Sequence, residues 1–149
     1  MAVLYALVED AVRESLSGMP RTSGETVKYV YEVVGGDEKE YTGSKTVEAV
    51  GNTWVDIVVT TGCRELVEAV VESMADMDLE VVVDGRVLLH CSWDRLVDMS
   101  RYMATIDALR EGDRRIIRLQ SIRSCSSVVI RVRPYSDTMV ESLYRYRGW

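Results

Sequence analysis

The residues that could do nucleophilic or acid–base chemistry are few and scattered along the chain. His90 is the only histidine, and Cys63, Cys91 and Cys125 are the three cysteines. His90 and Cys91 are neighbours in a segment that reads as a strand, and strand alternation puts neighbouring side chains on opposite faces. The two therefore do not form a nucleophile–base pair by adjacency. We expect His90 to be a structural or surface histidine.

Metal and cofactor motifs are also missing. The cysteines are odd in number and form no CxxC pair, which predicts reduced, core-type thiols rather than a zinc site or a disulfide framework. The Gly-rich segment 35–44, GGDEKEYTGS, lacks the spacing of a phosphate-binding loop. We expect no metal, no cofactor and no enzymatic activity. Four acidic residues step along the segment 63–77 and read as a solvated helix face: Glu65, Glu68, Glu72 and Asp76.

Arginines near the C-terminus form the other group that could bind something. If the segments 114–122 and 126–134 are strands, Arg118, Arg131 and Arg133 can form one stripe on a sheet face. Such a stripe could hold nucleic-acid phosphates, contact a protein partner or a second copy, or face solvent. Because the chain is acidic overall and no aromatic residue interleaves the stripe, nucleic acid is the weaker interpretation.

The charge is divided unevenly along the sequence. Residues 1–100 carry eight basic and nineteen acidic residues, a net −11, whereas residues 101–149 carry ten basic and five acidic residues, a net +5. Opposite patches on one subunit would let copies associate head to tail. The alternative is that both signs are solvated surface.

Local patterns predict the elements that must position these residues. Apolar residues at helical spacing predict helices over 2–17, 63–77 and 93–110, the last N-capped by Ser92 and closed by Gly112, and a short C-terminal helix begins at Ser136 or Asp137. Alternation predicts strands over 26–34, 45–50 and 53–61, and Asp84-Gly85 marks a hairpin within 79–91. The segments 114–122 and 126–134 are predicted to be a last pair of strands.

These elements give the order α-βββ-α-ββ-α-ββ-α. Strand runs with short connections favour antiparallel pairing, so we expect a single α+β domain over residues 1–149, with helices packed on a mostly antiparallel sheet. No apolar run approaches the length of a membrane span, and the N-terminus does not read as a signal peptide. Composition alone indicates a soluble intracellular, cytoplasmic protein.

Residues 1–77 follow a characteristic order: an opening helix MAVLYALVEDAVRESL, a Tyr-bearing strand, the polar excursion at 35–44, two further strands and a helix of the form xELxEAVxES. In this order the first half of the chain resembles the tail-terminator and tail-completion proteins of long-tailed phages. The resemblance implies a non-enzymatic virion structural protein that forms a head-to-tail ring, hexameric in the family. It also implies that the ring caps the tail tube and joins it to the head–tail connector.

Two features fit this resemblance. A head-to-tail ring needs two different complementary patches on one subunit, which the charge division offers. The loop 35–44 would suit an arm, with Tyr41 as its anchor, so the interface candidates are Tyr41, Arg118, Arg131 and Arg133. Two alternatives remain: a small nucleic-acid-binding or regulatory module that uses Arg118, Arg131 and Arg133, and a small-ligand-binding domain.

Overall fold

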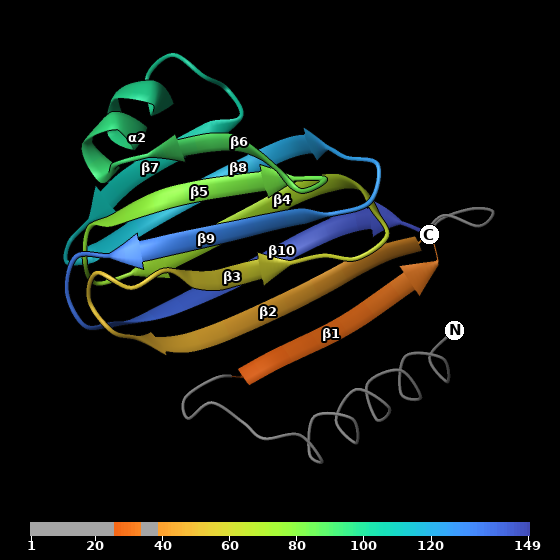
Figure 1. Cartoon of the computed structure of the whole chain (residues 1–149), viewed down its shortest axis with the longest axis horizontal. Coiled ribbons are helices and arrows are strands. Elements are labelled where there is room, and N and C mark those ends of the chain that lie inside the picture. The colour runs from red at the N-terminus through yellow and green to blue at the C-terminus, as the bar shows by residue number, and fades with distance from the viewer. Residues whose placement is uncertain (1–25, 34–38) are drawn as a thin grey trace.

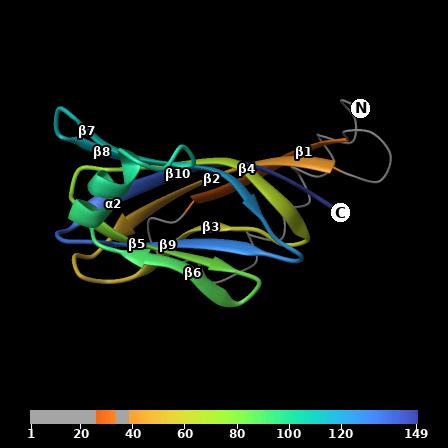
Figure 2. The ribbon, with the colours of Figure 1, turned by 90° about the horizontal axis from the view of Figure 1, so that it is seen from above.

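The chain folds into two antiparallel sheets packed face to face (Figures 1 and 2). The computed structural model describes the backbone of residues 26–33 and the whole of residues 39–149. The strands are β1 (Thr26–Val33), β2 (Lys39–Ala49), β3 (Val55–Val59), β4 (Cys63–Ser73), β5 (Met77–Val83), β6 (Arg86–Cys91), β7 (Ile106–Glu111), β8 (Arg114–Arg123), β9 (Val128–Pro134) and β10 (Thr138–Gly148). One helix, α2 (Trp93–Ser100), follows β6.

The strand order is that of a jelly roll. The six-stranded sheet runs β1-β2-β10-β4-β8-β7, and the four-stranded sheet runs β3-β9-β5-β6. The edge strands β1 and β7 are additions to this arrangement. When the other eight strands are counted afresh in chain order, the first, eighth, third and sixth (β2, β10, β4, β8) form one sheet. The second, seventh, fourth and fifth (β3, β9, β5, β6) form the other. This arrangement defines the double-sheet jelly roll. Strands distant in sequence therefore lie side by side, and β10 runs between β2 and β4 (Figure 1).

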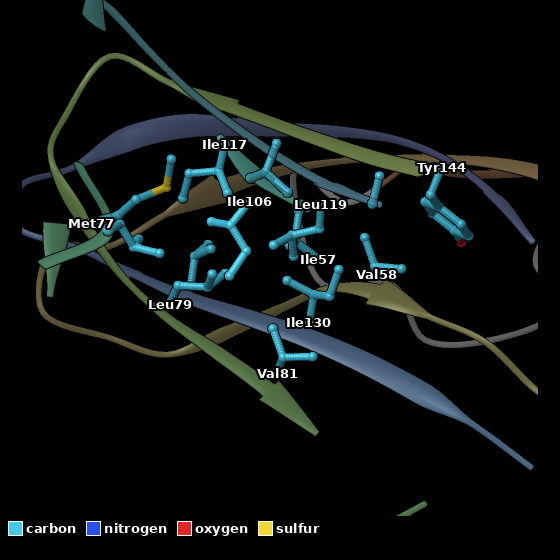
Figure 3. Close-up of a cluster of buried hydrophobic side chains, with 14 of the residues drawn as sticks. Ile57, Val58, Met77, Leu79, Val81, Ile106, Ile117, Leu119, Ile130 and Tyr144 are labelled. Carbon is cyan, nitrogen blue, oxygen red and sulfur yellow. The ribbon is translucent and has the colours of Figure 1, made fainter. Parts of the chain in front are cut away.

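The core fills the space between the sheets with branched aliphatic side chains (Figure 3). Ile57 of β3, Leu79 of β5 and Ile130 of β9 face Ile117 and Leu119 of β8, and each is at most 1% exposed. Burying such side chains provides most of the driving force for folding. A polar link also joins the sheets, because the buried Ser142 hydroxyl of β10 donates to the Ile57 carbonyl oxygen of β3 at 2.6 Å.

The expected α+β fold is wrong, and the segment 63–77 shows why. Its first eleven residues form strand β4 rather than a helix. The strand carries a bulge where it pairs with β10, since Leu66 pairs with Tyr146 and Glu68 with the adjacent Arg145, leaving Val67 without an opposite residue on β10. The buried positions consequently lie at Leu66, Ala69 and Val71, and the step of three mimics helical spacing.

Two more predicted helices are corrected by the structure. The segment after Asp137 is strand β10, whose inward side chains include Ser142, Tyr144 and Tyr146. Helix α2 begins where Ser92 predicts, and the Ser92 hydroxyl oxygen accepts from the Arg95 N–H, but the helix ends at Ser100. Strand β7 follows, and Gly112, with φ +61°, opens the β7–β8 turn rather than closing a helix.

Several strand predictions are confirmed. Strand β1 matches the expected 26–34, and β3 lies within 53–61. The Asp84-Gly85 turn joins β5 to β6 with φ angles of 52° and 80°, as a type I′ hairpin requires. The strand expected over 45–50 begins at Lys39, so residues 39–44 belong to a strand and not to a loop.

The remaining expectations concern the last pair of strands, the first helix and the absence of a membrane span. The strands predicted at 114–122 and 126–134 exist as β8 and β9, but they lie in opposite sheets and do not pair. The predicted helix over 2–17 lies outside the described residues. In the part of the chain that the structure describes, no helix has both the length and the apolar character needed to cross a bilayer.

Candidate interaction surface on the four-stranded sheet

Two of the expected interface residues, Arg131 and Arg133, lie on the outer face of the four-stranded sheet. Both are on β9, where alternation turns Val128, Ile130 and Val132 into the core and the intervening side chains outward. Because β9 has β3 on one side and β5 on the other, each outward arginine has cross-strand neighbours on two strands.

Arg131 is part of a row of ionisable side chains that crosses all four strands, here called the charged row. The strand register places Asp56 of β3 opposite Arg131, Arg131 opposite Glu80 of β5, and Glu80 opposite His90 of β6. Arg131 donates from Nε to Asp56 Oδ1 at 2.7 Å and from Nη1 to Glu80 Oε1 at 3.4 Å. His90 Nδ1 lies 3.0 Å from Glu80 Oε2, and the hydrogen bond to Asp56 raises the pKa of Arg131.

Arg133 joins a second polar group next to this row. Its guanidinium donates to Asp78 Oδ2 of β5, and the Tyr135 hydroxyl donates to the other oxygen of the same carboxylate. The Tyr135 hydroxyl also accepts from the Trp93 N–H, at the start of α2, at 3.3 Å. Burial raises the pKa of Tyr135, and its hydrogen bond to Asp78 raises it further.

Trp54 lies across this face. The Arg133 guanidinium carbon is 5.1 Å from the centre of the Trp54 ring, and the His90 ring centre is 5.4 Å from it. Since Trp54 precedes β3 at one edge of the sheet and His90 is on β6 at the other, the indole reaches over the strands between them. A cation over an aromatic face is a stabilising contact.

An apolar row lies next to the charged row, here called the valine row. The register pairs Val59 of β3 with Val129 of β9, Val129 with Val82 of β5, and Val82 with Val87 of β6. Val87 and its neighbour Leu88 are 59% and 65% exposed. The outer face thus combines an apolar row, an alternating charged row and an aromatic side chain, which makes it a candidate contact surface.

Arg118 does not belong to this surface, so the single stripe of three arginines is a wrong prediction. It lies on β8 in the six-stranded sheet, and its outward side chain pairs with Glu68 of β4 at 3.4 Å. The two outer faces point in opposite directions (Figure 2). The prediction failed because it assumed that β8 and β9 form a hairpin.

Tyr41, the fourth candidate, lies within β2 and not on a flexible loop. Its ring stacks on Tyr146 of β10 with centres 4.8 Å apart, and its hydroxyl lies 3.4 Å from the Trp149 carbonyl oxygen. Residues 34–38 of the expected arm lie outside the described residues. A role for Tyr41 as an arm anchor loses its structural premise, because the residue belongs to a paired strand.

The remaining chemically capable residues are spread out. Cys63 and Cys91 are buried, and burial raises the pKa of both thiols, whereas Cys125 is exposed and does not fit the expectation of a core cysteine. His90 is a surface residue, with its side chain 57% exposed, as expected. Among the described residues, no group of three His, Cys, Asp or Glu side chains could hold a metal ion.

A polar clasp joins two loops at one end of the sandwich. The Asp84 carboxylate, in the β5–β6 turn, accepts from the backbone N–H groups of Cys125, Ser126 and Ser127 at 2.8, 2.7 and 3.0 Å. These three hydrogen bonds hold the pKa of Asp84 far below its usual range. The clasp thus ties the β5–β6 turn to the connection between β8 and β9.

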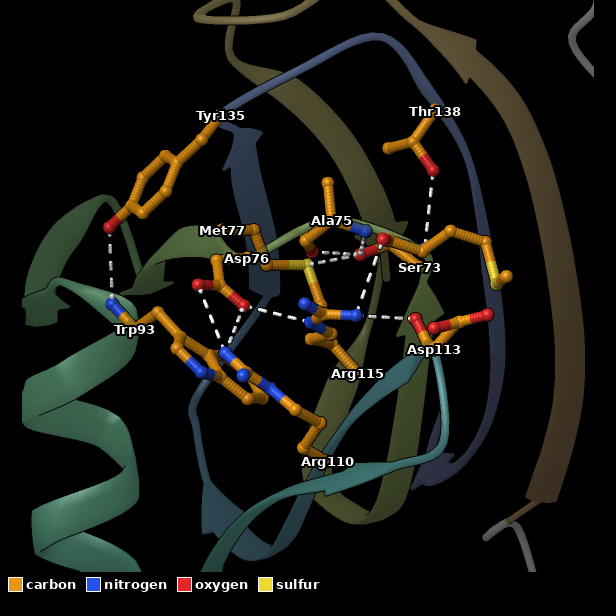
Figure 4. A network of polar contacts seen from close by, with 11 residues as sticks. Ser73, Ala75, Asp76, Met77, Trp93, Arg110, Asp113, Arg115, Tyr135 and Thr138 are labelled. Atoms are coloured by element: carbon orange, nitrogen blue, oxygen red, sulfur yellow. Dashed lines mark hydrogen bonds and ion pairs between the residues drawn. The ribbon is translucent and has the colours of Figure 1, made fainter.

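A second network stabilises the opposite region (Figure 4). The Asp76 carboxylate, in the β4–β5 turn, accepts from Arg110 Nη2 of β7 at 3.0 and 3.2 Å and from Arg115 Nε of β8 at 2.8 Å. Arg115 also donates to the Asp113 carbonyl oxygen at 2.6 Å. Three of the four acidic residues expected on a helix face, Glu68, Glu72 and Asp76, thus pair with arginines of β7 and β8.

Two surface depressions lie near this network. One, of about 400 Å³, is lined by Trp93, Asp94, Val97, Asp98 and Arg110. The other, of about 270 Å³, is lined by Glu72, Ser73, Met74, Arg114, Met139 and Glu141. The one hydroxyl nucleophile among these residues, Ser73, is buried and donates to the Ala75 carbonyl oxygen, so it is not paired with a base.

The charge division along the sequence disappears in the fold. Strands β9 and β10, from the basic rear of the chain, lie between strands of the acidic front, and β8 lies beside β4. Among residues 39–149, each arginine–carboxylate ion pair joins an arginine from 101–149 to a carboxylate from 1–100. The division therefore produces alternating columns of charge and not two separate patches.

Comparison with known proteins gives no family. No protein-family model matches the chain, and no curated protein matches it significantly. The residues that sequence reasoning missed are the acidic partners Asp56, Asp78 and Glu80, together with Trp54 and the valine row. Period-two alternation in the segments 53–61 and 79–83 was the signal that could have found them.

Proposed function

We propose that the chain is a virion structural protein, a non-enzymatic subunit that assembles with copies of itself. The observation that carries the proposal is the strand order. The jelly roll is the fold of many viral capsid subunits, and it is shared with lectins and cupins. Fold alone does not determine function, so the choice among these classes depends on the surfaces and the interior.

The interior argues against a cupin-like enzyme. A small β-barrel can hold a ligand inside only where its side chains leave room, whereas this chain fills the space between its sheets with Ile57, Leu79, Ile117, Leu119 and Ile130. Its only histidine is on the outside, bonded to Glu80. A packed interior with the notable chemistry outside suits a building block that functions through its surfaces.

Exposed apolar side chains support assembly. Leu143 and Met139 of β10 and Leu109 of β7 are 58%, 41% and 44% exposed on the outer face of the six-stranded sheet. Val87 and Leu88 are exposed at the edge of the four-stranded sheet. Met139 and Leu143 lie on one strand, and Val87 and Leu88 are consecutive, so each sheet presents exposed apolar side chains to a partner.

The tail-terminator form of the proposal has less support than the coarser one. Its resemblance included a helix after the third strand, and that segment is strand β4. A head-to-tail ring at the tail–connector junction remains one assembly that the proposal allows, and a closed shell is another. In either case the chain would act in the virion after assembly in the host cell.

Electron microscopy of the purified full-length chain tests the proposal. Closed particles of uniform size, either annular or shell-like, are the expected result, and their symmetry would distinguish a ring from a shell. Dispersed particles of monomer size at every concentration up to millimolar would overturn it. A glycan array in parallel addresses the lectin alternative, since selective sugar binding by a monomer would favour that class instead.

A further inference from the structure

We propose that the outer face of the four-stranded sheet binds the same face of a second copy about a twofold axis parallel to its strands. The inference deepens the proposed function by naming one contact surface. It stands on the distribution of charge across the four strands, β3-β9-β5-β6. The axis would pass between the two central strands, β9 and β5.

The distribution of charge is antisymmetric about that axis. Strand β9 carries the cations Arg131 and Arg133, and β5 carries the anions Asp78 and Glu80 at the opposite register positions. A twofold rotation that exchanges the two halves of the face lays β9 of one copy over β5 of the other. Each arginine then lies over the register position of an acidic residue on its mate's β5, and no like charges meet.

The edge strands follow the same rule. Asp56 of β3 occupies the charged row at one edge, and His90 of β6 occupies it at the other. The rotation places Asp56 of one copy over His90 of its mate. The row therefore pairs along its whole length, which is the self-complementarity that an isologous contact requires.

The apolar side chains also coincide. The same rotation lays Val129 over Val82 of the mate and Val59 over Val87, so the valine row meets itself. Trp54, which reaches from β3 over Arg133 towards His90, lies across the middle of the face. Aromatic side chains near the centre of an interface commonly provide much of its binding energy.

The contact is small. Four strands spaced about 4.8 Å apart, with about five residues each, present roughly 300 Å² of sheet face. A stable standard interface buries about 800 Å² on each partner. The twofold contact alone is thus expected to be weak and concentration-dependent, and to become permanent only where other contacts of an assembly add to it.

Charge exchange tests the geometry. Arg131→Glu places two carboxylates opposite each other in a pair of like variants, and Glu80→Arg places two guanidinium groups there. Each variant alone is expected to self-associate about tenfold more weakly than the wild type. An equimolar mixture of the two restores opposite charges at both positions, so it is expected to recover the wild-type association. Sedimentation measures all four samples, and thermal melts verify folding.

A matched control separates this face from the rest of the surface. Arg118→Glu makes the same charge change and breaks a similar pair, with Glu68, on the six-stranded sheet. It should leave the twofold contact unchanged. Val87→Lys, at a position already 59% exposed, gives a second variant that disrupts the valine row with little risk to folding.

The outcomes separate the two proposals. The twofold contact is wrong if the mixture fails to recover association, or if Arg118→Glu weakens association as much as Arg131→Glu does. In that case closed particles seen by microscopy would still support the proposed structural role. If the wild type stays monomeric throughout, both proposals fail.

Discussion

Arg131 of β9 lies directly opposite Glu80 of β5, with 3.4 Å between Nη1 and Oε1, although 51 residues separate them in sequence. A related ion pair lies on the other sheet, where Arg118 of β8, opposite Val70 of β4, reaches diagonally to Glu68 of β4 at 3.4 Å. The jelly-roll winding produces both pairs, because it places late basic strands beside early acidic ones. Charge that looks segregated in the sequence is therefore neutralised within the fold.

Strand β4 predicts that a truncation at Val71 costs more stability than one at Val70, whereas a helix over the same residues predicts the opposite order. Val71 faces the core at 0% exposure, while its neighbour Val70 lies on the outer face. Val71→Ala should lower the free energy of unfolding by roughly 2 kcal/mol. Val70→Ala should lower it by only a small fraction of that amount. Urea denaturation measures both. A larger loss at Val70 than at Val71 would mean that the segment is helical.

The clasp at Asp84 predicts a pH-dependent stability. Because the pKa of Asp84 is lowered on folding, its contribution is fully present above its unfolded value, about 3.9, and is lost as the pH falls through the lower folded value. Asp84→Asn keeps the size of the side chain, and asparagine tolerates the positive φ. An amide has only one acceptor oxygen, so it cannot accept the hydrogen bonds that reach both carboxylate oxygens.

Thermal melts between pH 7 and pH 2 should show that Asp84→Asn has a lower Tm than the wild type. This difference in Tm should become smaller only at the acidic end of the range. Asp107→Asn, at an exposed position on β7, is the matched control and should melt like the wild type at all pH values. A difference in Tm that is independent of pH would show that the charge of the Asp84 carboxylate does not hold the β5–β6 turn to the β8–β9 connection.

Gly43 is required by the ring that lies over it. A Cβ atom built at Gly43 would lie 2.5 Å from Cζ of Tyr144, a side chain only 2% exposed and directly opposite on β10. Gly43→Ala is expected to cost about 1–3 kcal/mol of stability through overpacking. Ser44→Ala, one residue along β2, is the control and should cost little.

A double-mutant cycle identifies the cause. Combining Gly43→Ala with Tyr144→Leu should cost less than the two single changes together, since the smaller side chain makes room for the methyl group. Simple additivity in the cycle would mean that the loss at Gly43 comes from the backbone and not from the ring.

The cysteines should differ in reactivity. Cys125 is exposed, whereas Cys63 and Cys91 are buried with raised pKa values, so a thiol reagent should modify one site per native chain and three after denaturation. Mass spectrometry counts the adducts. Cys125→Ser should abolish the native reaction, and rapid modification of that variant would contradict the burial of the other two.

The strands that sequence reasoning identified are those with undisturbed local signals. The Asp84-Gly85 turn and the alternation in β1, β8 and β9 could be read directly, because each depends on residues next to one another. Strand β4 could not, since its bulge at Val67 breaks the alternation and its Glu, Leu and Ala content favours a helix. Strand β10 was missed because Ser142 lies inward and Leu143 outward, which inverts the apolar pattern.

The candidate surface was only half predictable. Arg131 and Arg133 stand out by alternation on one strand, but their partners Asp56, Asp78 and Glu80 come from two strands between 51 and 75 residues away. Nothing local specifies that β9 lies between β3 and β5. The pairing follows from burial of both sheets in one core, which is a property of the whole chain.

The molar mass of the full-length wild-type chain, measured by light scattering over a dilution series at low and high salt, tests the central claim most directly. Self-association through a charged and apolar face predicts a mass that rises above the monomer value of 16.8 kDa with concentration, and rises less at high salt. A mass that stays at the monomer value across the series, at both salt concentrations, would contradict the account.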